Sequence, residues 1–175
     1  MFAVTERLLL RPGWAEDAPA LAATLGDERV VRNLARVPWP YALADAERFL
    51  ALPPDPLRPC FLIFERADAR LVGGIGLHGQ DGAELGYWIA RDRWGRGYAS
   101  EAGRAVCALA DASLRLPRLK ASHAPGNPAS GAVLRKLGFR PGMHGRLHSV
   151  GQGEAPEVRL LVRERAGAEA PPLAA

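Results

Sequence analysis

The sequence predicts a single α/β domain built around a mixed, mostly antiparallel sheet. Strand-like segments lie both before and after two helical segments, an order that is typical of such sheets. The length of 175 residues, 48% of them hydrophobic, suits one buried core. No internal repeat is present, so the sequence does not indicate a solenoid or a propeller.

The first third of the chain begins with a strand and continues with helices. TERLLLRP alternates in polarity and breaks at Pro12, which predicts a strand. Apolar positions then follow helical spacing up to Gly26, whereas residues 27–40 have no clean period. A second short helix is expected from Asp45 to Leu52, where prolines stop it.

Three apolar runs in the middle of the chain predict an antiparallel meander. They are CFLIFE, ARLVGGIGLHG and AELGYWIA, and short turn segments separate them. From Ala99 the apolar positions recur at helical spacing until Pro117 ends the pattern.

The last third returns to strands around one helix. RLKAS predicts a strand, 128–137 a helix, and GRLHSV and EVRLLVRE a closing pair of strands. We expect the domain to span residues 1–165 and the alanine- and proline-rich residues 166–175 to form a disordered tail.

Charge and composition limit the partners. Lys plus Arg number 23 against 19 Asp plus Glu, and the net charge is +4. This balance favours an anionic partner, but the arginines form no block, so no direct nucleic-acid binding is expected. Cys60 and Cys107 form no C-x-x-C pair, and His144 and His148 have no evident third ligand, so we expect no metal site.

The N-terminus lacks the features of a signal peptide, and no segment approaches the roughly 18 apolar residues of a membrane span. We therefore expect a cytoplasmic protein that does not bind membranes.

Two glycine-rich segments compete as binding loops. Gly74, Gly76 and Gly79 spell G-x-G-x-x-G, but another strand follows instead of the helix that a dinucleotide loop needs. These glycines are therefore expected in a hairpin or bulge.

The second segment, WGRGYAS at 94–100, lies between a predicted strand and a predicted helix. Small residues let backbone amides approach an anion, and the positive end of the helix dipole attracts phosphate. The segment lacks the G-K-[ST] ending of a Walker loop, so it would hold a phosphorylated cofactor rather than cleave it. The alternative is a plain strand-to-helix turn.

Nearly the whole chain resembles the GNAT superfamily of acyl-CoA-dependent N-acetyltransferases, most closely the RimJ/RimL type that acetylates ribosomal-protein N-termini. The blocks TERLLLRP, AELGYWIA, WGRGYASEA, RLKAS and NPASGAVLRKLGF follow the order and spacing of that family. The resemblance implies a sheet of six to seven strands, splayed between strands four and five and flanked by about four helices. It also implies acetyl-CoA as the acyl donor.

The resemblance assigns residues to the donor. Loop amides would hold the CoA diphosphate, the end of the fourth strand would pair with the pantetheine arm, and the family asparagine would bond the same arm. Carried onto this sequence, the cofactor-binding residues are Trp88, Ile89, Ala90, Trp94, Gly95, Arg96, Gly97, Tyr98, Ala99, Ser100, Asn127 and Ser130.

Two side chains are catalytic candidates. Glu84 resembles the family glutamate that accepts the amine proton, and Ser130 lies where the RimJ/RimL type places a hydroxyl near the sulfur. The tyrosine acid of many members is absent, because its position holds Leu134. There are two alternatives: Ser130 caps the start of the helix, and His78 or His123 acts as the base.

The acceptor is expected to be a primary amine. At pH 7 roughly a tenth of an α-amine is neutral, against less than about a thousandth of a lysine side chain. A modest base such as Glu84 therefore fits a protein N-terminus, while small amines and antibiotics are alternatives.

Trp39 and Tyr41 lie where family members line the acceptor groove, or else anchor their loop by packing. We expect a monomer or homodimer. A CoA-binding module without turnover is the competing function.

Overall fold

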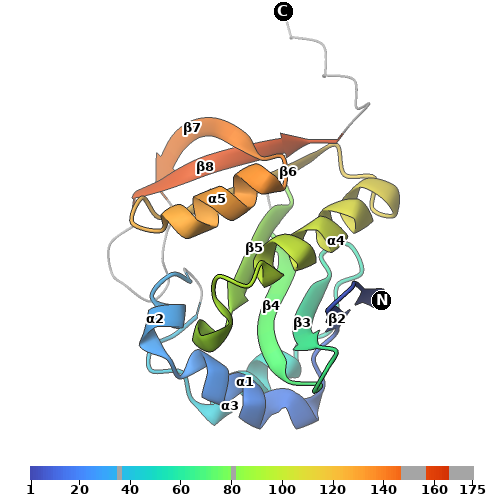
Figure 1. The fold of residues 1–175 in the computed structure, drawn as a ribbon, viewed down its shortest axis with the longest axis vertical. Coiled ribbons are helices and arrows are strands. Elements are labelled where there is room, and N and C mark those ends of the chain that lie inside the picture. Colours follow the sequence, from blue (N-terminus) through green and yellow to red (C-terminus); the bar gives the residue numbers. More distant parts are fainter. Residues whose placement is uncertain (35–36, 80–81, 147–156, 166–175) are drawn as a thin grey trace, which may run out of the picture.

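One eight-stranded sheet organises the part of the chain that the computed structural model describes, residues 1–34, 37–79, 82–146 and 157–165 (Figure 1). The strand order is β1-β2-β3-β4-β5-β6-β8-β7. The strands are β1 (Ala3–Val4), β2 (Leu8–Arg11), β3 (Cys60–Glu65), β4 (Leu71–His78), β5 (Glu84–Ile89), β6 (Arg118–His123), β7 (Arg140–Arg146) and β8 (Glu157–Glu164). The α-helices are α1 (Ala18–Leu25), α2 (Glu28–Val31), α3 (Leu43–Leu50), α4 (Tyr98–Ala112) and α5 (Pro128–Lys136).

The predicted meander is confirmed. β3, β4 and β5 pair antiparallel in succession, and β2 adds to the free edge of β3. Because side chains alternate along a strand, neighbours such as Phe61 and Leu62 enter buried clusters on opposite faces of the sheet. The mixed α/β fold class is confirmed as well, with eight strands and five α-helices in the described residues.

The sheet opens between β5 and β6, the one parallel pair among the described strands. They share a single register pair, Glu84 with Lys120, and the Lys120 amide donates to the Ala83 carbonyl at 2.8 Å. β4 and β5, by contrast, pair along the whole length of β5. The parallel strands therefore separate beyond Glu84, which confirms the predicted splay. The family's strands four and five are β5 and β6 here, because β1 adds a strand at the start.

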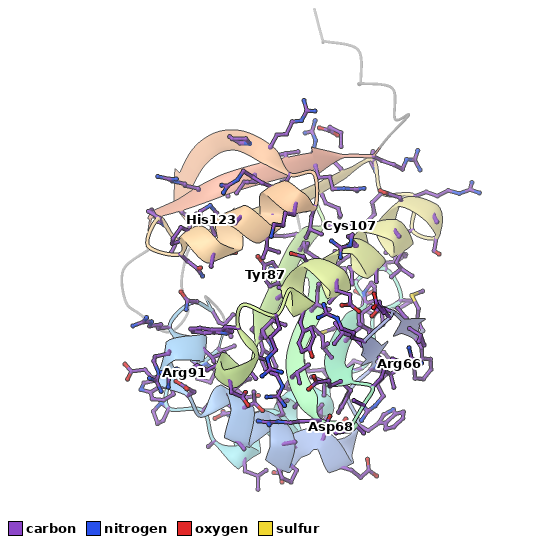
Figure 2. The ribbon with its side chains drawn as sticks, in the orientation of Figure 1. Arg66, Asp68, Tyr87, Arg91, Cys107 and His123 are labelled. Atoms are coloured by element: carbon purple, nitrogen blue, oxygen red, sulfur yellow. The ribbon has the colours of Figure 1, made fainter. Side chains whose placement is uncertain are left out.

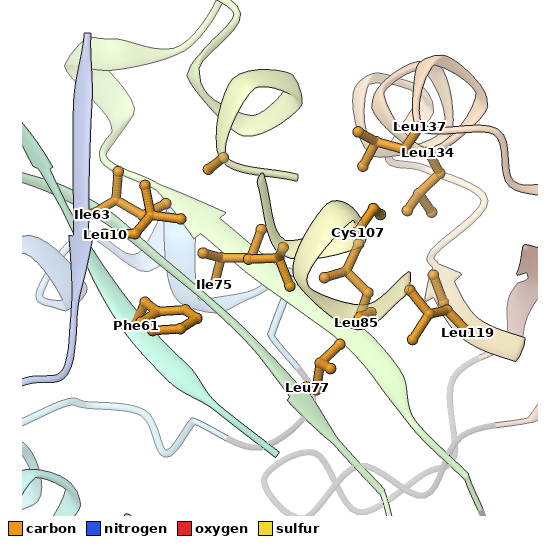
Figure 3. Close-up of a cluster of buried hydrophobic side chains, with 14 of the residues drawn as sticks. Leu10, Phe61, Ile63, Ile75, Leu77, Leu85, Cys107, Leu119, Leu134 and Leu137 are labelled. Carbon is orange, nitrogen blue, oxygen red and sulfur yellow. The ribbon is translucent and has the colours of Figure 1, made fainter. Parts of the chain in front are cut away.

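Each face of the sheet carries its own buried cluster. α4 and α5 cover one face, where Leu85 of β5 belongs to the same cluster as Cys107 of α4 and Leu134 of α5 (Figure 3). α1, α2 and α3 cover the other face, over residues such as Leu62 and Leu71. The cluster under α4 and α5 includes residues from both sides of the splay, such as Leu85 of β5 and Leu119 of β6, so packing continues across the splay on that face.

Three features near the N-terminus differ from the prediction. β1 is an additional two-residue strand paired with β2. α2 spans four residues, and one helical turn is too short to show a period. α3 begins at Leu43 rather than Asp45, because the Asp45 carboxylate accepts a hydrogen bond from the Ala42 amide at 2.8 Å and so lies within the first turn.

At the other end, β7 begins at Arg140, earlier than the predicted strand. Residues 147–150 of that strand and the predicted tail, 166–175, lie outside the described residues.

The first glycine motif has the structure predicted for it. Gly74 and Gly76 lie inside β4, and Gly79, with φ of +103°, belongs to the turn toward β5. No helix opens there, which excludes a dinucleotide loop. Among the described helices, none is long and apolar enough to cross a membrane.

Candidate active site

The second glycine segment forms the connection from β5 to α4. Gly95 and Gly97 have φ of +76° and +81°, a left-handed backbone that favours glycine. A Cβ atom on Gly95 would have no neighbour within 4 Å, and one on Gly97 would meet only the Arg7 Nη2 atom, at 3.6 Å. Intrahelical bonding in α4 begins with the Glu101 amide, which donates to the Gly97 carbonyl at 3.0 Å. The 15-residue helix therefore presents its N-terminal amides to an open side of the loop.

A buried carboxylate ties this loop to the start of the chain. Glu101 accepts hydrogen bonds from the Thr5 hydroxyl at 2.6 Å and from the Arg7 amide at 2.9 Å and Nε at 2.8 Å. Burial alone would raise the pKa of Glu101, but these hydrogen bonds lower it below its ordinary value. Arg7 also donates to the Arg96 carbonyl at 3.0 Å, so its guanidinium links the helix to the loop.

Two aromatic side chains fix the conformation of the loop through hydrogen bonds. The Trp94 indole N–H donates to the Ile89 carbonyl at 2.7 Å. The Tyr98 hydroxyl bonds to Glu65 of β3, which also accepts from Arg93 Nε at 3.0 Å. These contacts join the loop to the meander on which it rests.

The backbone of β5 faces the splay at alternate residues. The Ala90 amide donates to the Val72 carbonyl at 2.8 Å, so Ala90 pairs with β4. Hydrogen-bonded pairs alternate in an antiparallel ladder, so Trp88 also points its backbone groups to β4, and Tyr87 and Ile89 point theirs to the open edge. Of the three strand residues assigned to the pantetheine arm, Ile89 has its amide on that edge.

Across the splay, Asn127 begins α5. Its Oδ1 accepts from the Ser130 amide at 3.1 Å, and its Nδ2 donates to Asn33 Oδ1 at 3.3 Å. Asn127 thus provides the helix cap considered for Ser130, and the Ser130 hydroxyl lies 2.8 Å from the Tyr87 hydroxyl instead. Leu134, in place of a family tyrosine, is fully buried.

Glu84 lies on the face of β5 opposite to Tyr87. Its Oε1 accepts from the Ser122 hydroxyl at 2.8 Å, and its Oε2 lies 3.6 Å from His78 Nε2. Three polar side chains from β4, β5 and β6 therefore meet beside the point where β5 and β6 part. His123 is not among them, because alternation along β6 turns it to the other face, where its ring lies against Gly131 of α5.

The two aromatic acceptor candidates lie on the α1–α3 side. Trp39 is half exposed and lines an open depression of 740 Å³ together with residues of α1, α2 and their connection, namely Ala23, Gly26, Asp27, Glu28 and Arg29. Tyr41 packs against the cluster beneath these helices, and burial raises its pKa to about 12.

Sequence reasoning missed Tyr87, Ser122 and the Arg7–Glu101 pair. Tyr87 lies two residues from each of the buried Leu85 and Ile89, so strand alternation places its side chain on their face of β5, and this was the one signal for it in the sequence.

The described residues contain no group of three His, Cys, Asp or Glu able to hold a metal ion. His148, half of the H-x3-H pair, lies outside them.

The chain matches known acetyltransferases over most of its length. Residues 7–140 match the acetyltransferase (GNAT) domain family. The uncharacterized N-acetyltransferase p20 of Bacillus licheniformis is 30% identical over 173 residues, which cover 93% of this chain and 97% of that protein.

Solved structures share the fold. The GNAT-family acetyltransferase of Bacillus anthracis has a TM-score of 0.81 at 24% identity, over 94% of this chain and 98% of that one. RimL, a ribosomal L7/L12 α-N-protein acetyltransferase in complex with coenzyme A, has a TM-score of 0.76 at 18% identity, over 94% and 98% of the two chains.

Proposed function

The chain belongs to the GNAT family of acetyltransferases and is an N-acetyltransferase, and from this premise we propose that it acetylates the N-terminal α-amine of a protein. The observation that carries the proposal is the splay between β5 and β6. It lies between the face with Ser130 and the face with Glu84. A donor and an acceptor that enter from opposite faces would meet there.

The donor side fits acetyl-CoA, which supplies an acetyl group activated as a thioester. Left-handed Gly95 and Gly97 keep side chains away from the amides at the start of α4, which suits a diphosphate. The amides of 96–100 would bind it, and the outward-facing amide of Ile89 would bond the pantetheine arm opposite Asn127. Trp94 and Tyr98 would keep the loop in the geometry that this binding requires.

Glu84 is the proposed general base. Its side chain is 17% exposed, and the Ser122 hydrogen bond holds one carboxylate oxygen in place. The other oxygen would accept the amine proton, directly or through water. His78, at 3.6 Å and 35% exposed, would pass that proton to solvent.

The basicity of the acceptor supports an α-amine over a lysine. At neutral pH roughly a tenth of an α-amine is already uncharged, so a single carboxylate is a sufficient base. RimL, which shares the fold, is named as an α-N-protein acetyltransferase, in agreement with this acceptor class. The depression beside Trp39 would receive the first residues of the acceptor. Of its lining carboxylates, Asp27 is paired with Arg29 at 3.0 Å, so Glu28 would be the one to attract a cationic chain end.

The acceptor is tested with paired peptides and acetyl-CoA, with mass spectrometry to locate the product. One peptide has a free N-terminus and no lysine, and its partner has a blocked N-terminus and one lysine. We expect acetylation of the first alone. Transfer only to the lysine, or only to small amines, would contradict the proposal. Binding of CoA without transfer to any amine would indicate a CoA-binding module.

The base is tested by Glu84→Gln, which keeps the shape and removes the proton acceptor. We expect turnover to fall by about 10² to 10⁴ with little change in the Kd for acetyl-CoA. Glu47→Gln, at an exposed position of α3, is the matched control. An unchanged rate in Glu84→Gln would move the role to His78 or to water.

A further inference from the structure

Tyr87 joins the two sides of the splay through a single side chain. It belongs to β5, and its hydroxyl oxygen lies 2.8 Å from Ser130 Oγ and 3.2 Å from the Ser130 carbonyl oxygen on α5. Figure 2 shows Tyr87 between α5 and the first turn of α4. A phenylalanine would fill the same space, so packing alone does not explain the hydroxyl group at this position.

The two acceptors allow two hydrogen-bond arrangements. In one, Ser130 donates its proton to Tyr87, and Tyr87 donates to the Ser130 carbonyl. In the other, Tyr87 donates to Ser130 Oγ, and the serine proton is free for a third group. A negative charge next to Ser130 favours the second arrangement, because a charged acceptor forms the stronger bond.

Tyr87 is a donor in this pair rather than a source of protons. Burial raises its pKa to about 12, and the bond with Ser130 acts in the opposite direction. The phenol therefore stays protonated at neutral pH and does not deliver its proton to a weaker base.

We propose that Tyr87 is a positioning residue that turns the Ser130 hydroxyl toward the sulfur of the departing CoA. This inference rests on the proposed function and on the family resemblance, which implies that the donor sulfur lies near Ser130. The new C–N bond forms as the C–S bond breaks, and the electron pair stays on sulfur. The amine proton goes to Glu84, Ser130 stabilises the thiolate by a hydrogen bond, and no proton leaves Tyr87.

A binding experiment tests this without turnover. CoA has an ionisable thiol and acetyl-CoA does not, so the ratio of their Kd values reports how strongly the site favours a thiolate. Between about pH 7 and pH 10, we expect the wild-type protein to gain about tenfold in relative affinity for CoA.

Tyr87→Phe and Ser130→Ala should both lose this gain, which a purely structural role of either hydroxyl would leave intact. The neighbouring elements carry further titratable groups, among them His123 of β6 and Cys107 of α4. Burial raises the pKa of the Cys107 thiol to about 11, so this thiol stays mostly uncharged over the range tested. Both variants keep these two groups, so a gain that is lost in Tyr87→Phe and Ser130→Ala does not come from them. A gain that persists in Tyr87→Phe would overturn the proposal.

Kinetics provide the second test. We expect Tyr87→Phe and Ser130→Ala each to lower kcat by about tenfold, with KM for acetyl-CoA unchanged, and the double variant to be no slower than either single one. Ser113→Ala, at an exposed position after α4, controls for loss of a serine hydroxyl.

Additive losses would show that the two hydroxyls act separately and would overturn the inference. A wild-type protein that acetylates no amine would refute the proposed function, whereas normal transfer by both wild type and Tyr87→Phe would refute only the role of Tyr87.

Discussion

The two glycine-rich segments use the same residue for opposite reasons. In β4, a Cβ atom on Gly74 would lie 2.5 Å from the Trp88 indole nitrogen, so glycine there allows close packing. In the loop before α4, Gly95 and Gly97 have open space beside them and a left-handed backbone. Glycine there allows the left-handed conformation and leaves the loop surface free of side-chain atoms. A glycine pattern therefore acquires a meaning only from the elements that flank it.

The largest expected effect is that of Gly97→Glu on donor binding. A carboxylate at the start of α4 would stand beside the amides proposed for the diphosphate and repel it. We expect the Kd for acetyl-CoA to rise by about 100-fold or more, measured by calorimetry. Gly97→Ala is the matched control, since it carries the same backbone strain without the charge. Equal Kd values for the two variants would refute the loop assignment.

Gly74→Val tests the other segment and should act on stability instead. The added side chain collides with Trp88, and overpacking of this kind costs about 1–3 kcal/mol of unfolding free energy. Denaturant unfolding measures the loss, and the folded protein should keep its acetyl-CoA affinity. Gly126→Ala, where a Cβ atom has no neighbour within 4 Å, should be nearly neutral in the same unfolding experiment. A selective loss of cofactor binding in Gly74→Val would contradict this difference in role between the two glycine-rich segments.

Glu101→Gln tests the contacts that attach the loop before α4 to the start of the chain. Its charged hydrogen bonds to Thr5 and Arg7 would weaken, at a cost of about 2 kcal/mol near pH 7. The folded-state pKa of Glu101 lies below the ordinary value of 4.5, so the carboxylate stabilises the fold above that pH. This stabilisation is lost as the pH falls below 4.5 and the group takes up a proton. The difference in unfolding free energy between wild type and variant should therefore shrink in acid, and a constant difference would contradict the role of the charge.

The smallest expected effect is that of Gly95→Ala. Its φ of +76° penalises a side chain, but the added methyl group meets no atom within 4 Å. We expect a loss of about 1 kcal/mol in unfolding free energy and a much smaller change in acetyl-CoA affinity than in Gly97→Glu. A loss clearly above the roughly 2 kcal/mol that a left-handed backbone alone can cost would show that the loop is packed rather than open.

Local patterns were enough to predict the frame of the site. Three apolar runs separated by turn segments predicted the meander, and the helical period after Ala99 predicted α4, so the loop between them was also located. α2 was not predicted because a single turn shows no period, and the turn that follows it supplies Asn33, the partner of Asn127 at the start of α5.

The catalytic candidates illustrate the same limit. Strand alternation tells that Glu84 and Tyr87 face opposite sides of β5, but not which helices cover each side. Their partners, Ser122 and Ser130, come from elements about 40 residues away, and no local period connects them.

The order of the elements and the position of the loop follow from the amino-acid sequence alone, because periodicity and glycine placement are local properties of the chain. Which side chains meet across the site depends on the tertiary structure. Arg7 reaches Glu101 over a separation of 94 residues, and Tyr87 reaches Ser130 over 43, because β2 and β5 pack beside α4 and α5 on one face of the sheet. Such contacts depend on how whole elements pack, which no short stretch of sequence specifies.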